Sequence, residues 1–311
     1  MPLARHTSVP SLARKVATTT AWVLALAISS HAGQPSAPPD CVELVRRAVQ
    51  NEIKAGEGDF AHFMFHGIKT TPRESTTRIY AETKEAIAGM VVAYNGKPLT
   101  PEQREAEQAR IEQLANHPDE LRKKREQEKQ NEEHTMRIMR ALPDAFLYEY
   151  VGDEQPSPGI GGASDRLVKL RFRPNPTYQP PSRVEEVLTG MQGYVLIDPV
   201  HLRIAGIDGT LFKEVGFGWG ILGHLNRGGR FIVQQQDVGD NVWEISSMTL
   251  NFTGKILVFK NLTINSKEVF SDFKPIPPNL TFAQGVDLLK KEQSSETADN
   301  CCRPSIAQEA K

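Results

Sequence analysis

Three glycines have the spacing that most suggests chemistry in this chain of 311 residues. Gly218, Gly220 and Gly223 match the pattern G-x-G-x-x-G, whose glycines let a helix N-terminus approach a dinucleotide pyrophosphate. That chemistry also requires a full helix after the glycines and then a parallel strand. Here Gly228 and Gly229 would end a helix almost at once, and the following segments predict antiparallel strands. We therefore interpret this run as a glycine-rich crossover, with a flexible gate over a pocket as the alternative, and expect no cofactor.

Two histidines have a spacing that would bring them together on a helix. His62 and His66 belong, however, to a segment in which Phe63 and Phe65 alternate with other residues, and this pattern predicts a strand. On a strand, side chains four residues apart are separated by about 13 Å, too far to share one ion. We expect these histidines to lie on a polar rim or to have hydrogen-bond partners, and we expect no metal site.

The motifs of common catalytic sites are absent from the sequence. It contains no G-x-S-x-G, no H-E-x-x-H and no phosphate-binding loop. The aspartates Asp198, Asp208, Asp237 and Asp240 fall at expected turns, where Asp bonds the nearby backbone. We expect a protein that is not an enzyme; a hydrolase with a dispersed site is an alternative, which a perturbed carboxylate or histidine in a cleft would favour. The net charge of −1 does not indicate a nucleic-acid partner.

The first 32 residues have the pattern of a signal peptide. Basic residues precede an apolar run at 16–28, and small residues at Ser30 and Ala32 stand where a signal peptidase reads. We predict cleavage near Ala32, a linker at 33–40, and a periplasmic or extracellular protein; an uncleaved anchor is the alternative. The three cysteines leave two arrangements open, a bridge from Cys41 to Cys301 or Cys302 and three free thiols.

A meander of antiparallel strands between 189 and 273 organises the predicted fold. Short β-branched runs at 193–198 and 202–207 flank an Asp198-Pro199 turn and predict a hairpin. Farther along, Trp243 shares one strand face with Ile245, whereas Met248, Leu250 and Phe252 share the other. A sheet that is apolar partly on both faces is either sandwiched or curved around something.

The remaining elements indicate an α+β protein. Thr100, Pro101 and Gln103 form a capping box that starts a helix, and Pro118 breaks it, so 100–141 is predicted to form a helical hairpin. Its middle, 122–134, is almost wholly charged, which indicates a solvated hairpin or, alternatively, an arm that docks a partner. The other predicted elements are helices at 41–55, 182–188 and 282–289, strands at 60–68, 75–83, 85–94, 146–151 and 167–172, and a disordered tail at 291–311. The expected organisation is one domain at 41–290 with the hairpin inserted.

Several runs in this chain resemble known proteins. Residues 193–198, followed by Leu202-Arg203-Ile204, resemble a hairpin of the outer-membrane lipoprotein-sorting superfamily of periplasmic carriers. The runs 217–223, 142–146 and 172–176 are similar to a set of uncharacterised secreted bacterial proteins. The first resemblance implies an incomplete, strongly curved antiparallel barrel whose concave side is plugged by helices and leaves an apolar cavity for acyl chains.

These observations predict an exported cell-envelope protein that binds or carries a lipid or a lipoprotein. An apolar cavity is what such cargo requires. The alternative is a periplasmic protein-interaction or sensing module that acts through the charged hairpin and has an envelope protein as its partner. The candidate cavity-lining residues are Phe63, Phe65, Trp219, Phe231, Trp243 and Phe259.

Overall fold

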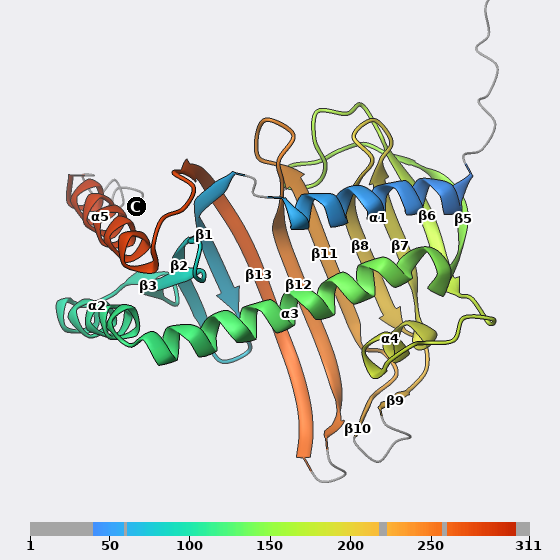
Figure 1. The fold of residues 1–311 in the computed structure, drawn as a ribbon, viewed down its shortest axis with the longest axis horizontal. Coiled ribbons are helices and arrows are strands. Elements are labelled where there is room, and N and C mark those ends of the chain that lie inside the picture. The colour runs from blue at the N-terminus through green and yellow to red at the C-terminus, as the bar shows by residue number, and fades with distance from the viewer. Residues whose placement is uncertain (1–39, 59–60, 218–222, 257–259, 303–311) are drawn as a thin grey trace, which may run out of the picture. The chain divides into compact units, whose positions relative to one another are not determined.

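The computed structural model describes residues 40–58, 61–217, 223–256 and 260–302, and shows an α+β fold (Figure 1). The described strands form one antiparallel sheet of 13 strands, whose main path runs β4-β3-β2-β1-β13-β12-β11-β8-β7-β6-β5. The edge strands β4 and β5 do not pair with each other, so the sheet is open. This confirms the expected fold class.

The sheet is built from strands in two parts of the chain, which meet where β1 pairs with β13. The strands are β1 (His62–Thr70), β2 (Ser75–Ala81), β3 (Ala88–Tyr94), β4 (Lys97–Pro98), β5 (Phe146–Glu154), β6 (Leu167–Pro174), β7 (Met191–Asp198), β8 (Arg203–Leu211), β9 (Val215–Phe217), β10 (Gly223–Leu225), β11 (Arg230–Asp237), β12 (Trp243–Ile256) and β13 (Lys260–Ile276). The predicted hairpin is β7–β8, and Asp198 shapes its turn by accepting hydrogen bonds from the backbone N–H groups of Val200 and His201.

Helices cover the two ends of the sheet. Helix α1 (Cys41–Glu57) packs against β5 and β8 and alongside α3 (Pro118–Ala145), whereas α2 (Pro101–Asn116) and α5 (Phe282–Cys302) pack against β3 (Figure 1). Two main clusters of buried residues result, one under α1 around Val45, Leu170 and Ile197, and one under α2 and α5 around Ile79 and Phe282. The central strands β1, β11, β12 and β13 lie between these helix-covered ends.

The predicted start of α2 is confirmed in atomic detail. Thr100 Oγ1 accepts from the N–H of Gln103, and Gln103 Oε1 accepts from the N–H of Thr100 at 2.9 Å. The helix pair then docks through polar groups as well as through Ile111, since Glu107 accepts from the N–H of Val91. The middle of α3 stays exposed, as its charges predict.

We expect Thr100→Ala to lower the free energy of unfolding by about 1 kcal/mol. The Ala side chain leaves the N–H of Gln103 without its acceptor at the start of α2. Urea unfolding of the two proteins would measure the loss. Thr100→Ser keeps the hydroxyl and should lose little; an equal loss in Ser and Ala variants would show that the methyl group, not the cap, matters.

Helix α5 and the run after β8 differ from the prediction. The sequence predicted a disordered tail from residue 291, but α5 continues to Cys302. Polar residues of this helix have partners in the fold; for example, Gln108 Nε2 donates to the buried Gln293 at 2.9 Å. The expected crossover contains two short strands, β9 and β10, which pair with each other.

The signal segment, residues 218–222 and the last nine residues lie outside the described part of the chain.

A candidate ligand site on the central strands

One face of the central strands carries a group of half-buried apolar side chains, which we call the apolar strip. Cross-strand partners share a sheet face, and the pairs Phe231–Leu250, Val233–Met248, Phe252–Ile264 and Phe65–Tyr80 place these side chains together. Its members are Phe65, Tyr80, Phe231, Val233, Met248, Leu250, Phe252, Leu262, Ile264, Phe270 and Phe273, and each is only partly shielded from solvent.

The strip lies on the same face of the sheet as α1 and α3. Cross-strand pairing shows this: Val195, in the core under α1, pairs with Ile207, Ile207 pairs with Val233, and Val233 pairs with Met248. Because paired residues share a sheet face, these four side chains lie on the same side of the sheet. The opposite face of β13 is exposed and mostly polar, with Thr263, Asn265 and Lys267 pointing to solvent. The long strands are therefore two-sided, and their apolar side is the one that the helices only partly cover.

Aromatic rings lie flat over glycines in this strip. The ring of Phe65 stacks on those of Tyr80 and Phe273, each with centroids 5.2 Å apart. A Cβ at Gly209 would lie 2.3 Å from the ring of Phe231, and one at Gly67 would lie 2.7 Å from the ring of Tyr80. Larger residues at these glycines would lift the rings off the sheet, so the sequence keeps the strip shallow and smooth.

The middle of α3 crosses in front of β12 and β13 (Figure 1) but cannot bury the strip. Lys124 and Glu128 pair with each other one turn apart at 2.6 Å and are both about two-thirds shielded, whereas the neighbouring residues from Arg125 to Gln127 are exposed. Glu128 also accepts from the N–H of Ile87 at 3.1 Å. Between residues 122 and 134 of α3, the least exposed side chains are thus polar, and apolar side chains on the strands find no matching surface there.

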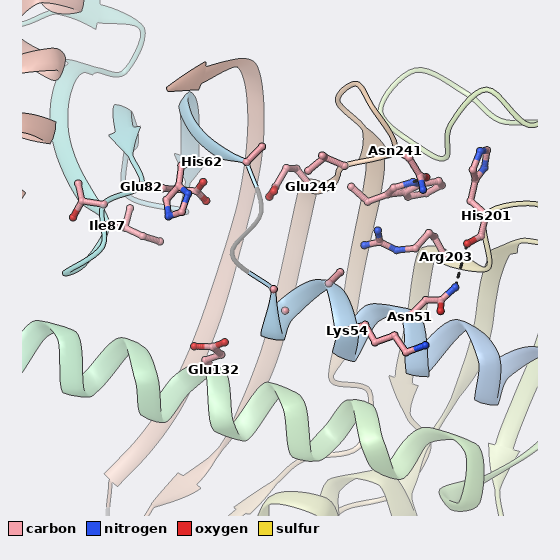
Figure 2. Close-up of a pocket in the computed structure, with 17 residues that line it drawn as sticks. Asn51, Lys54, His62, Glu82, Ile87, Glu132, His201, Arg203, Asn241 and Glu244 are labelled. Atoms are coloured by element: carbon pink, nitrogen blue, oxygen red, sulfur yellow. Dashed lines mark hydrogen bonds between the residues drawn. The ribbon is translucent and has the colours of Figure 1, made fainter. Parts of the chain in front are cut away.

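A cavity of about 600 Å³ with both charged and apolar lining residues opens at the rim of the sheet; we call it the rim pocket (Figure 2). Its walls come from the end of α1, the start of β1, the end of β2, the middle of α3, and the starts of β8 and β12. The residues that shape its chemistry are Asn51, Lys54, His62, Glu82, Glu132, His201, Arg203, Trp243 and Glu244.

A buried ion pair forms one wall of the rim pocket. Arg203 Nε and Nη2 donate to the two carboxylate oxygens of Glu52, each at 2.9 Å, and Glu52 Oε1 also accepts from the N–H of Ile204 at 2.8 Å. Both side chains are 9% exposed. The guanidinium lies 5.6 Å from the centre of the Trp243 ring. These contacts tie α1 to β8 and β12.

Two carboxylates stand on the other side of the pocket: Glu82 lies close to His62, and the side chain of Glu244 points from the start of β12 toward the side of Glu82 (Figure 2). Glu82 Oε2 accepts from the N–H of Phe63 at 2.8 Å, and burial raises its pKa above the usual value. Burial also raises the pKa of Glu244, and the nearby charge of Glu82 adds to this, so that its pKa is about 7 although Arg203 opposes the shift. Ionising Glu244 beside an ionised Glu82 is therefore energetically unfavourable in the folded protein.

A serine, a histidine and an aspartate also meet near the pocket. Ser164 Oγ and His201 Nδ1 both contact the same oxygen of Asp198, the latter at 2.9 Å, and Ser164 Oγ lies 3.3 Å from that same ring nitrogen. A nucleophilic triad needs the serine on the other ring nitrogen. Burial raises the pKa of Asp198, but hydrogen bonds from Ser164, His201 and Val200 outweigh it and hold the pKa below its usual value. The group therefore orders the β7–β8 turn.

The structure places the six sequence-predicted lining residues in different surroundings. Phe65 and Phe231 lie on the apolar strip. Phe63 is buried and meets Phe273 edge to face at 6.1 Å. Trp243 lines the rim pocket and packs with Leu167 and Ala205. The last two, Trp219 and Phe259, lie outside the described residues.

Of the residues that line the rim pocket, sequence reasoning named only Trp243 as a lining residue. Glu82 and Glu244 are separated by about half of the 311 residues, and each stands next to the end or start of a strand, where a charged residue is unremarkable. Among the described residues, no group of His, Cys, Asp or Glu side chains is arranged to hold a metal ion. In the same part of the chain, no helix is long and apolar enough to cross a membrane.

Comparisons with known proteins add a distant structural neighbour. Neither the family models nor the curated protein sequences contain a match. Among solved structures, a DUF1329 family protein from Desulfovibrio piger is similar over 79% of this chain and 97% of its own, with 8% sequence identity and a TM-score of 0.27. A similarity this remote assigns no activity, so the proposals below rest on the site itself.

Proposed function

We propose that the protein binds an acyl chain along the apolar strip and acts as a lipid or lipoprotein carrier of the cell envelope. The observation that carries this proposal is the group of half-buried apolar side chains on β11–β13, β1 and β2 facing a polar stretch of α3. Buried apolar area is the main source of affinity for an acyl chain, at about 25 cal/mol per Å². The signal-peptide pattern of the first 32 residues supports the envelope location.

The strip matches an acyl chain better than it matches a protein surface or a small polar ligand. Its side chains are large, and many are flat rings. Of the polar side chains on that face, Glu268 is paired with Lys69 and Ser266 is buried. An extended alkyl chain needs a long apolar surface and very few hydrogen bonds. The strip offers this along several strands.

The test is displacement of a fluorescent fatty acid from the mature protein. Phe270→Asn puts an amide into the strip beside Gly67 and should weaken binding about tenfold, since an amide buried without a partner costs about 1–3 kcal/mol. Val269→Asn is the matched control, because Val269 is the neighbouring residue on the opposite face and is 38% exposed. Absence of saturable probe binding to the wild type, or equal loss in both variants, would contradict the proposal.

Two other functions rank below this one. A hydrolase would use Glu244, whose pKa is raised. The serine near that cavity, Ser164, instead donates a hydrogen bond to Asp198 in the β7–β8 turn, so it does not act as a nucleophile there. A protein-interaction module would use the exposed charges of α3, and deleting 100–141 would then abolish partner capture. The α2 contacts with β3 and α5 show that such a deletion also removes part of a core.

A further inference from the structure

The rim pocket and the apolar strip belong to one surface. Glu82 directly follows β2, and its backbone N–H donates to the carbonyl of Phe63 at 3.0 Å, which continues the pairing of β2 with β1. Cross-strand partners share a face, so Glu82 lies on the face of Phe63, Phe65 and Tyr80. Phe63 in turn contacts Phe273 of the strip. On α3, Glu132 of the rim pocket lies one turn beyond Glu128, which is part of the polar side over the strip. The rim pocket therefore stands where the strip reaches the rim of the sheet.

The charges that face this cavity are unbalanced toward negative. Glu82 directly follows β2, Glu244 comes from β12 and Glu132 from α3. The opposing cations are Lys54 from α1 and Arg203 from β8, and Arg203 is already held by both oxygens of Glu52. His62 and His201 complete the titratable groups of the lining. A ligand that enters this cavity next to Glu82 and Glu244 meets carboxylates first.

We propose that the rim pocket receives a positively charged ammonium head group of the same ligand whose acyl chain lies on the strip. This inference rests on the proposed function, because the strip supplies the apolar half of the site. An ammonium group carries hydrogen-bond donors and a charge that complements two desolvated carboxylates. The cavity volume of about 600 Å³ suits a molecular head group.

The experiment compares three amphiphiles that share one chain and differ in the head group. Dodecylammonium, dodecanol and dodecanoate would each be tested for displacement of the fluorescent fatty acid from the mature protein at pH 8. The two ionic amphiphiles are kept below their micelle concentrations and dodecanol below its solubility. We expect dodecylammonium to bind at least about tenfold more tightly than dodecanoate, with dodecanol between them. Glu244→Gln should bring dodecylammonium close to dodecanol and leave dodecanol unchanged.

A conservative and a remote variant separate charge from shape. Glu244→Asp keeps the carboxylate and should retain most of the preference for dodecylammonium. Glu268→Gln alters a carboxylate that pairs with Lys69 elsewhere on the strip face, and should leave the ratio of dodecylammonium to dodecanoate affinities unchanged.

The possible outcomes distinguish the two proposals. Equal binding of all three amphiphiles, or a preference for dodecanoate, would overturn the head-group inference while the acyl-chain function stands. Displacement by none of them, together with no saturable fatty-acid binding, would overturn both. A preference for dodecylammonium that survives Glu244→Gln and Glu82→Gln would place the head group elsewhere and also overturn the inference.

Discussion

Replacing Glu52 by Ala is expected to lower the free energy of unfolding by about 3–5 kcal/mol. The change leaves the guanidinium of Arg203 buried without its counter-ion, and it also removes the acceptor of the Ile204 N–H. Both side chains of the pair are 9% exposed, so water cannot replace the lost carboxylate without opening the contact between α1 and β8. The effect should therefore exceed that of any exposed pair in the protein's described surface.

Urea unfolding of three further variants would test the cause of this loss. Glu57→Ala removes an exposed partner of Arg140 near the same end of α1 and should cost less than about 1 kcal/mol. The double change Glu52→Leu with Arg203→Met removes both charges and should recover most of the stability, apart from the unpaired Ile204 N–H. If Glu52→Ala cost no more than Glu57→Ala, the buried pair would not be what holds α1 to the sheet.

Local signals in the sequence predicted the elements well because their causes are local. The Thr100–Gln103 box and the Asp198 turn depend on residues within three positions of each other, and both have the expected hydrogen bonds. The apolar face switch between Trp243 and Met248 was also visible. Its cause, a bulge that shifts the pairing of β12 with β11 between Gln234 and Gln235, depends on the partner strand and could not be read from one segment.

The site could be predicted only in part, because its two halves have different origins. The strip follows from alternation along β1, β11, β12 and β13, and it contains Phe65 and Phe231, two of the residues that the sequence predicted to line a cavity. The rim pocket depends on which strand ends meet, and the pairing of β1 with β13 joins segments about 200 residues apart. Nothing in the sequence around Glu82 or Glu244 signals that they will be neighbours. The polar residues of α5 likewise indicated disorder until their partners on α2 and β13 were known.

Wild-type stability is expected to fall as the pH rises from about 4.5 to about 7, and Glu244→Gln should remove much of that fall. The folded-state pKa of Glu244 is raised to about 7 from its usual 4.5, by burial first and by Glu82 second. Between these values the folded protein keeps a proton that the unfolded chain has released, so deprotonation favours unfolding. At 1.36 kcal/mol per pKa unit, and discounted for partial exposure, the cost reaches about 2–3 kcal/mol above pH 7.

Urea unfolding at pH 4.5 and pH 8 would measure this dependence. Glu244→Gln should gain stability over the wild type at pH 8 and gain little at pH 4.5, where the native carboxyl is already neutral. Glu82→Gln should produce a smaller gain, because burial of Glu244 remains after its charged neighbour is removed. Glu105→Gln, on the exposed side of α2, is the control and should leave the slope unchanged. A Glu244→Gln protein with the wild-type slope would show that this carboxyl titrates normally.

The same cost links stability to the proposed ligand. A cation that binds only the folded protein stabilises it by an amount that grows with the logarithm of the ratio of its concentration to its dissociation constant. Because Glu244 is ionised in the folded state only above about pH 7, dodecylammonium should stabilise the wild type more at pH 8 than at pH 5. Dodecanol should stabilise it equally at both values. The Glu244 carboxylate that destabilises the ligand-free protein is then the group that selects the ligand. If dodecylammonium stabilised the protein equally at pH 5 and pH 8, Glu244 would not be the group that binds its head group.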